Sequence, residues 1–244
     1  MNRIISLIAL LLVCWTMSAQ NVSIDGIIVT GDPSRGTQAP VNLGTKDYQE
    51  VVYLSRVEGN QVFLTDTAVV DKKGHFRINT SVTQPTLHLL KFKGKEYSTI
   101  HLMLEAGDEI AIEMKDHADK SFIEITSAKG SRNIEVYRQF NNILHHYSTL
   151  LNALNEEHSL STTSAARKQE LSAQFQRLVA QQNVEVSNLL QQNSYVLVSS
   201  FLVTFFDEDA ENHIGLCETI YNSLKPKYTN NQFVQYLEGK LQST

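Results

Sequence analysis

The stretch SFIEITSAKGSRNIEVYRQF, residues 121–140, contains the change of pattern that decides the fold. Before Gly130 the chain follows the period of two that is typical of β-strands. After it, apolar residues such as Ile134 and Tyr137 recur at the spacing of an α-helix, and Ser131 is a good N-cap for that helix. We therefore expect strands on the N-terminal side of Gly130 and helices on the C-terminal side.

The N-terminal half consists of short β-branched and aromatic runs without an intervening helix. Turn-forming clusters such as Glu58-Gly59-Asn60 and Ala106-Gly107-Asp108 separate the runs at hairpin spacing. The runs are Ser23–Val29, Val51–Val57, Val62–Val70, His75–Thr80, Leu87–Phe92, Ser98–Leu104, Glu109–Met114 and Phe122–Thr126. They predict an antiparallel β-sandwich, with a surface loop over the Pro- and Gly-containing gap from Gly31 to Thr45.

The C-terminal half carries helical patterns throughout. The predicted helices are Arg132 to about Leu154, a longer one with its apolar stripe from Leu171 to Leu190, a buried one from Tyr195 to Phe206, and two short amphipathic ones at Ile214–Leu224 and Gln232–Leu241. A polar link, His158 to Ser164, joins the first two. The predicted fold class is α+β, with an N-terminal antiparallel β-sandwich followed by a C-terminal all-helical segment.

The first residues have the pattern of a secretory signal peptide. Arg3 is followed by an apolar run from Ile4 to Val13, too short to span a bilayer, and then by small residues as far as Ala19. Cleavage after Ser18 and after Ala19 are equal alternatives. We expect a signal peptide at 1–19, a β-sandwich domain at 20–128, a helical domain at 129–244, and export to the periplasm or cell envelope.

Two other interpretations of this segment stay open. Cys14 could be lipidated and anchor the chain to a membrane, although a lipobox has Gly, Ala or Ser where this chain has Val13. The segment could also be an ordinary buried helix. Signal-peptide cleavage predicts a mature chain that begins at Ala19 or Gln20.

Composition excludes several classes of function. The formal charge is −5 and there is no basic run, so no nucleic-acid partner is expected. No apolar stretch beyond the first residues reaches the length of a membrane span. With Cys14 removed, Cys217 is the one remaining cysteine, so the mature chain can form no internal disulfide.

Several short motifs carry a resemblance to a known family. They are Ile24-Asp25-Gly26-Ile27, Val52-Tyr53-Leu54, Asp66–Val70 with Lys73–Phe76, Leu104–Ile110, Lys129–Asn133, Asn193-Ser194-Tyr195 and Leu224–Tyr228. The chain resembles the N-terminal part of Bacteroidetes-type exported AhpC/TSA- and TlpA-like thiol-disulfide proteins. In those proteins a β-rich domain of unknown function and a helical segment precede a thioredoxin domain. That domain's Cys-x-x-Cys pair has no counterpart here, so none of the family's redox mechanism is expected in these residues.

Cys217 is the sole candidate for thiol chemistry in the mature chain. Dithiol exchange needs an attacking and a resolving thiol, so no redox site is expected. We interpret Cys217 as a small apolar residue on a helix face. If it were exposed, mixed-disulfide formation or dimerisation would become possible.

The best candidate for metal binding is a histidine pair. If Phe92 and Tyr97 flank the intervening turn, His88 and His101 lie directly opposite each other on adjacent strands and could share a cation. No third ligand is evident, and half-exposed strand positions readily accept histidine. We therefore expect neither a metal nor a cofactor.

Thr67 is a candidate for modification. Asp66-Thr67-Ala68 resembles the O-glycosylation acceptor of secreted proteins in the same bacterial group. The same residues also suit a strand that leads into a turn.

The alternation of two central runs predicts which residues share a face. One buried face is expected to hold Leu87, Leu89, Ile100, Leu102 and Leu104. The opposite face, with Leu90, Phe92, Tyr97 and Met103, must be covered by the helices or by a partner, because so much apolar area is seldom left to water.

Three classes of function follow. The favoured one is a non-catalytic exported binding or scaffolding module with a protein partner. The second is an accessory to a separate thioredoxin-like protein, and the third is an enzyme whose site is assembled from scattered polar residues. An exposed apolar patch would favour the first class, and a pocket with convergent carboxylates or histidines would favour the third.

Overall fold

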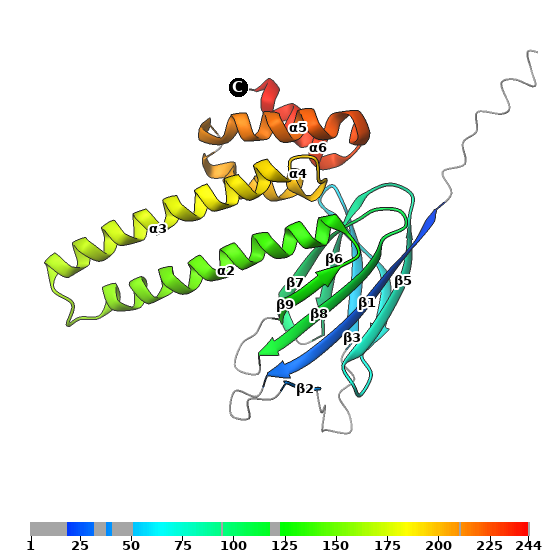
Figure 1. Ribbon diagram of the computed structural model, residues 1–244, viewed down its shortest axis with the longest axis horizontal. Coiled ribbons are helices and arrows are strands. Elements are labelled where there is room, and N and C mark those ends of the chain that lie inside the picture. Colours follow the sequence, from blue (N-terminus) through cyan, green and yellow to red (C-terminus); the bar gives the residue numbers. More distant parts are fainter. Residues whose placement is uncertain are drawn as a thin grey trace, which may run out of the picture.

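The computed structural model describes residues 19–31, 38–40, 51–93, 95–117, 123–209 and 211–243. Within these residues all strands precede all helices, which confirms the α+β class. Two sheets face each other, and the helices lie beyond one end of them (Figure 1). Among the described helices, none is long and apolar enough to cross a membrane.

The two sheets divide the strands between them. The first sheet contains β2 (Gln38–Pro40), β1 (Gln20–Gly31), β5 (His75–Val82), β8 (Glu109–His117) and β9 (Ile123–Lys129). The second has the order β4 (Gln61–Val69), β3 (Val51–Glu58), β6 (Thr86–Phe92) and β7 (Lys95–Leu104). All eight predicted runs are strands, and β2 lies in the gap predicted to be a loop.

One strand pair departs from the predicted antiparallel arrangement. β1 pairs with β8 in parallel, from Ser23 opposite Glu109 to Gly31 opposite His117. β5 and β2 pair antiparallel along the other edge of β1, so β1 is a central strand. Such an insertion joins segments far apart in sequence, and hairpin spacing cannot reveal it.

The space between the sheets forms the core. Alternate side chains of each strand point into it, as the pleat requires. The buried side chains of this layer include Val22, Ile24, Ile28, Val52, Leu54, Ile78, Leu90, Ile100, Leu102, Leu104, Ile110, Ile112 and Met114.

The register of β6 and β7 corrects the predicted faces. His88 lies opposite Leu102, and Leu90 lies opposite Ile100. The prediction was wrong by one residue, because the pairing shifts at a bulge between Lys91 and Phe92. Leu87 and Leu89 therefore lie on the face opposite Ile100, Leu102 and Leu104, while Leu90 and Phe92 belong to the core.

Helices cover the face of β6 and β7 that points away from the space between the sheets. Met103 is buried there, and the His101 ring packs against Tyr137 and Phe201. The helical cover that the sequence predicts is therefore present. Met103 lies under it as predicted, and Leu87 lies there in place of Leu90 and Phe92. The side chain of Tyr97 lies outside what the structure describes.

The helices differ from the prediction mainly in length. They are α2 (Arg132–Ser159), α3 (Ala165–Gln192), α4 (Val198–Leu202), α5 (Ile214–Tyr228) and α6 (Gln232–Gln242), with 3₁₀ turns η1 (Val203–Asp209) and η2 (Glu211–His213). The buried helix predicted from Tyr195 begins at Val198, because a turn in which Val196 N–H donates to the Asn193 carbonyl precedes it. η1 contains the remainder of that segment.

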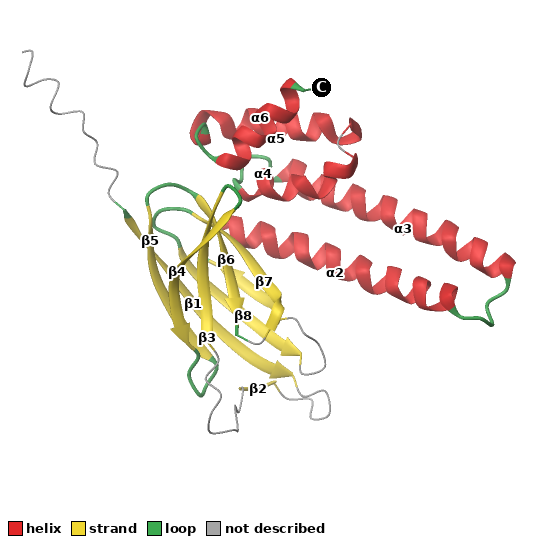
Figure 2. Ribbon diagram, turned by 180° about the vertical axis from the view of Figure 1, so that it is seen from behind, coloured by secondary structure: helices red, strands yellow, loops and turns green. Residues whose placement is uncertain are grey.

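The helices form two groups in space. α2 and α3 make an antiparallel hairpin that extends to one side of the sandwich, and α4, α5 and α6 gather above one end of it (Figures 1 and 2). The first half of α2 packs on β7 and β9 of the sandwich.

Truncation of Leu102 tests the observed register. Leu102 is 1% exposed, so Leu102→Ala should lower the free energy of unfolding by about 2–5 kcal/mol. Leu64→Ala is the matched control, because Leu64 is 61% exposed on strand β4 and should change it by less than about 0.5 kcal/mol. Urea unfolding of both variants measures the difference, and equal losses would contradict the burial of Leu102 between the sheets.

Candidate functional site

The turn between β7 and β8 begins a polar joint between the sandwich and the helices. In Glu105-Ala106-Gly107-Asp108, the Glu105 N–H donates to Asp108 Oδ2 at 2.8 Å and the Asp108 N–H donates to the Glu105 carbonyl at 3.1 Å. Gly107 has a φ of 86°, which favours glycine. The Asp108 carbonyl also accepts from Ser23 N–H, which ties the turn to β1.

Gly130 brings the start of α2 against this turn. Its φ is 89°, and a Cβ there would lie 1.8 Å from the Glu109 carbonyl oxygen. Only glycine allows this approach. As a result, the Ser131 hydroxyl donates to Asp108 Oδ2 at 3.3 Å.

Asn133 connects three elements through one buried amide. Its Nδ2 donates to Glu105 Oε1 at 2.9 Å, and its Oδ1 accepts from the Val198 N–H at 2.9 Å. The β7–β8 turn, the first turn of α2 and the start of α4 are thereby fixed relative to one another.

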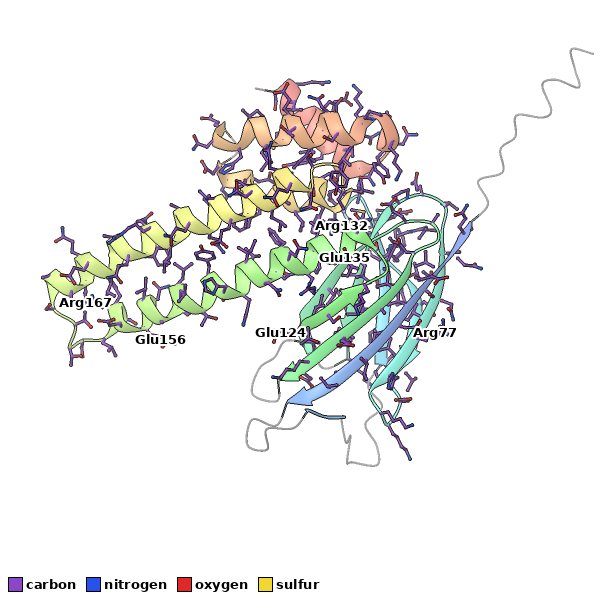
Figure 3. The ribbon with its side chains drawn as sticks, in the orientation of Figure 1. Arg77, Glu124, Arg132, Glu135, Glu156 and Arg167 are labelled. Carbon is purple, nitrogen blue, oxygen red and sulfur yellow. The ribbon has the colours of Figure 1, made fainter. Side chains whose placement is uncertain are left out.

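Two further contacts extend the joint to the later helices. Arg132 donates to Asn193 Oδ1 at 2.7 Å, which links the base of α2 to the end of α3 (Figure 3 labels Arg132). The Tyr228 hydroxyl donates to Glu105 Oε2 at 2.8 Å, and Lys227 Nζ lies 3.4 Å from the same oxygen.

The joint contains four of the sequence motifs that carry the family resemblance. They are the segments around Glu105, Ser131, Asn193 and Tyr228. In this chain these four segments attach the helices to the sandwich. Sequence reasoning found these segments but did not predict that they meet.

The carboxylates of the joint accept hydrogen bonds from neighbouring elements. Glu105 accepts from Asn133, Tyr228 and Lys227, so both of its oxygens have partners. Burial raises the pKa of Asp108, although the Glu105 N–H and the Ser131 hydroxyl oppose this shift. These contacts support an architectural role for both groups.

A separate hollow of about 270 Å³ lies between α2 and the strands β7 and β9. Its floor is apolar and its rim carries one carboxylate and one imidazole. The lining residues are Thr99, Ile100, Ile123, Glu124, Ile125, Tyr137, Asn141, Asn142, Leu144, His145 and Ser148. The hollow is open, and its size is at the lower end for small-molecule sites.

The structure does not bring His88 and His101 together as predicted. His88 lies opposite Leu102 and His101 lies opposite Leu89, so the two imidazoles point to opposite faces of the sheet. The same bulge that shifts the register separates them. Among the described residues there is no group of three or more His, Cys, Asp or Glu side chains placed to hold a metal ion.

Each of these histidines has a structural partner. His88 Nδ1 lies 3.0 Å from the Thr86 carbonyl oxygen, which can only accept, so Nδ1 carries the proton. His101 Nδ1 lies 3.0 Å from the Tyr137 hydroxyl. Burial lowers the pKa of both imidazoles, and therefore favours their neutral forms.

Cys217 is buried in α5, with 1% of its surface exposed. Burial raises the pKa of its thiol, while nearby Lys240 partly offsets this shift and Asp207 adds to it. The net rise opposes formation of the reactive thiolate. The thiol therefore has the surroundings of the packing residue expected from sequence.

The other predicted positions are distributed as follows. Thr67 is exposed on β4, where its N–H donates to Asp66 Oδ1 at 2.7 Å. Cys14 and the other residues up to Ser18 of the predicted signal peptide lie outside the described residues. Glycosylation and lipidation stay predictions.

The most prominent exposed apolar surface is on strand β4. We name Val62, Phe63, Leu64 and Val69 the β4 strip, in which Val62 and Leu64 lie on one face of the border strand and Phe63 lies on the other. Val62 is 53% exposed, Phe63 41%, Leu64 61% and Val69 53%. Sequence reasoning identified the run as a strand, but a continuous apolar run is equally typical of a buried one.

Removal of the Asn133 amide tests the joint. Asn133→Ala leaves the buried Val198 N–H and a Glu105 oxygen without their partner, and should cost about 2–4 kcal/mol of unfolding free energy. Asn152→Ala is the control, because Asn152 is exposed on the same helix and should have an effect below about 0.5 kcal/mol. Chemical denaturation compares the two variants. A loss of unfolding free energy as small as that of the control would contradict a stabilising role of the Asn133 amide in the joint.

Comparison with known proteins gives limited matches. No curated protein matches the chain. A crystal structure of (S)-allantoin synthase is similar over 46% of this chain and 45% of that one, with 11% sequence identity and a TM-score of 0.28. The chain thus spans less than half of that structure, and the likeness carries no argument.

A family match covers part of the chain. Residues 41–137 match the family described as a domain of unknown function, DUF4369. The matched range includes β3 to β9 and the first residues of α2, but not β1, the central strand of the first sheet. The sandwich is therefore the matched domain together with the two strands that precede it, β1 and β2.

Proposed function

We propose that this protein is a non-catalytic exported binding or scaffolding module that binds a protein partner through the β4 strip. The single observation that carries the proposal is the exposure of Val62, Phe63 and Leu64 on a strand at the border of a sheet. Soluble surfaces rarely leave adjacent large apolar residues uncovered unless the surface binds something.

The edge of β4 suits the addition of an extended segment. Within the described chain β4 pairs with β3 alone, although nine residues, about 30 Å of strand, are available. Edge strands usually carry lysine or proline, which prevent pairing with other chains. β4 has neither, and its one charged residue, Asp66, is held by Thr67 N–H.

The proposed partner is an extended, largely apolar segment of another protein. Such a segment would gain main-chain hydrogen bonds from the edge and apolar contacts from the strip. The bulge between Leu54 and Ser55 interrupts the β3–β4 ladder. The free edge of β4 is therefore regular only on either side of the bulge. The end that contains Val62, Phe63 and Leu64 offers the larger apolar area.

The export part of the proposal rests on the sequence of the first nineteen residues. The basic, apolar and small-residue order of that segment supports secretion to the periplasm or cell envelope. The resemblance to AhpC/TSA- and TlpA-like proteins supports the same compartment.

Charge on the β4 strip should abolish partner capture. In Val62→Lys/Leu64→Lys the two ammonium groups oppose both strand pairing and apolar contact, so capture of a partner from envelope extract should be lost. The matched control is Val184→Lys/Leu160→Lys, which makes the same two changes at exposed positions elsewhere. Capture that survives in the strip variant, or that is lost equally in the control, argues against the β4 strip as the binding surface.

A second candidate function is accessory to a separate thioredoxin-like protein, and the family resemblance favours it. It predicts a mixed disulfide through Cys217, whereas burial of that thiol argues against one. We expect Cys217→Ser to retain partner capture, with and without reductant. A partner that only the wild-type protein captures, and that reductant releases, would place the accessory function first.

A further inference from the structure

The three large side chains at the start of the β4 strip lie on two faces of the border strand. Phe63 lies opposite Arg56, which shares a face of β3 with the buried Leu54. Phe63 therefore lies on the side that faces the other sheet. Val62 and Leu64, one position before and after it, lie on the outer side. A segment that covers all three side chains must present apolar groups on both of its own faces.

The register of the β3–β4 hairpin decides which main-chain groups of β4 are directed toward its free edge. Glu58 pairs with Gln61 across a two-residue turn, and the closing pair of such a turn is hydrogen-bonded. Hydrogen-bonded and non-hydrogen-bonded pairs alternate along an antiparallel ladder. The N–H and C=O groups of Phe63 therefore bond to β3, and those of Val62 and Leu64 point away from β3 toward the free edge.

A strand added to this edge has one position of closest side-chain contact. Antiparallel pairing is the more stable arrangement per residue, and in it the added main chain bonds to Val62 and Leu64. The residue between these two bonded pairs lies opposite Phe63 in a non-hydrogen-bonded pair, with Cα atoms about 4.5 Å apart and side chains close together. Phe63 is 41% exposed, so ring surface is available for this contact. The central residue of the added segment is therefore the one that Phe63 contacts most closely.

The charges around this part of the edge are few. No charged residue lies from Gln61 to Thr65, and Asp66 follows beyond the bulge. On the neighbouring strand, Arg56 and Glu58 pair with each other at 3.1 Å. A charged residue in the facing part of a partner would lose water without meeting an opposite charge on β4. An uncharged segment is therefore favoured here.

We propose that the β4 strip selects an extended, uncharged segment with three consecutive apolar residues, of which the central one is large and packs on Phe63. This inference rests on the proposed function and names the sequence class of the partner. A segment with polar and apolar residues in alternation would cover Val62 and Leu64 but would place a polar side chain against the Phe63 ring. The aromatic cross-strand pair and the burial of the central side chain should separate the two classes of segment by about tenfold in affinity.

Two synthetic peptides test the proposal in calorimetric titrations of the mature chain. One begins Thr-Val-Phe-Val-Thr and the other Thr-Val-Thr-Val-Thr, and both are acetylated, amidated and extended by the same Gly-Gly-Lys-Lys tail. The wild-type protein should bind the first peptide about tenfold more tightly. Phe63→Thr should bring the two affinities within about threefold of each other, because the ring that contacts the central residue is gone. Circular dichroism should show an unchanged fold, since Phe63 is substantially exposed.

The matched control is Val184→Thr, which removes an exposed apolar side chain from α3 and should retain the tenfold preference. Equal affinity of the wild-type protein for both peptides, a preference that survives in Phe63→Thr, or no binding of either peptide at about 1 mM would overturn the proposal. A wild-type dimer in sedimentation velocity that Val62→Lys/Leu64→Lys dissociates would also overturn it, because a second copy would then occupy the edge.

Failure of this proposal is distinguishable from failure of the proposed function. Capture from envelope extract that is lost in Val62→Lys/Leu64→Lys, together with equal affinity for the two peptides, refutes the selection by Phe63 alone. Capture that survives in that variant refutes the β4 strip as the binding surface.

Discussion

The architecture depends on one buried amide, that of Asn133. A side chain at this position must donate to the Glu105 carboxylate and accept from the Val198 N–H at the same time. Aspartate lacks the donor, and a hydroxyl lacks the planar spacing of the two groups. Because a buried backbone N–H that loses its partner is costly, the position of α4 is tied to that of α2. α5 follows through Tyr228, which binds the other oxygen of Glu105.

Element types could be predicted from the sequence because their causes are local. The period changes within ten residues of Gly130, and both sides of the change fold as that pattern indicates.

The register of the strands was not predictable in the same way. At the irregularity beside Lys91, β7 has three extra residues between Lys95 and Thr99, and every later residue of β7 is thereby one position away from its predicted partner. The parallel pairing of β1 with β8 joins segments about 85 residues apart, which alternation within either strand does not record.

The candidate surfaces also differ in how much of each could be predicted from the sequence. The joint was visible as short motifs, but Glu105 and Tyr228 are 123 positions apart, so their contact required the folded chain. The exposure of β4 was hidden for a different reason. Val62, Phe63 and Leu64 form an unbroken apolar run, and such a run is more often buried on both faces than exposed at a border.

The strand order separates the β4 strip from the helices. β4 is one border of the four-stranded sheet, and β7, on which α2 packs, is the other. Three strand spacings, about 14 Å, lie between these borders. A segment bound at the β4 strip therefore leaves the helical cover of β7 and the joint in place.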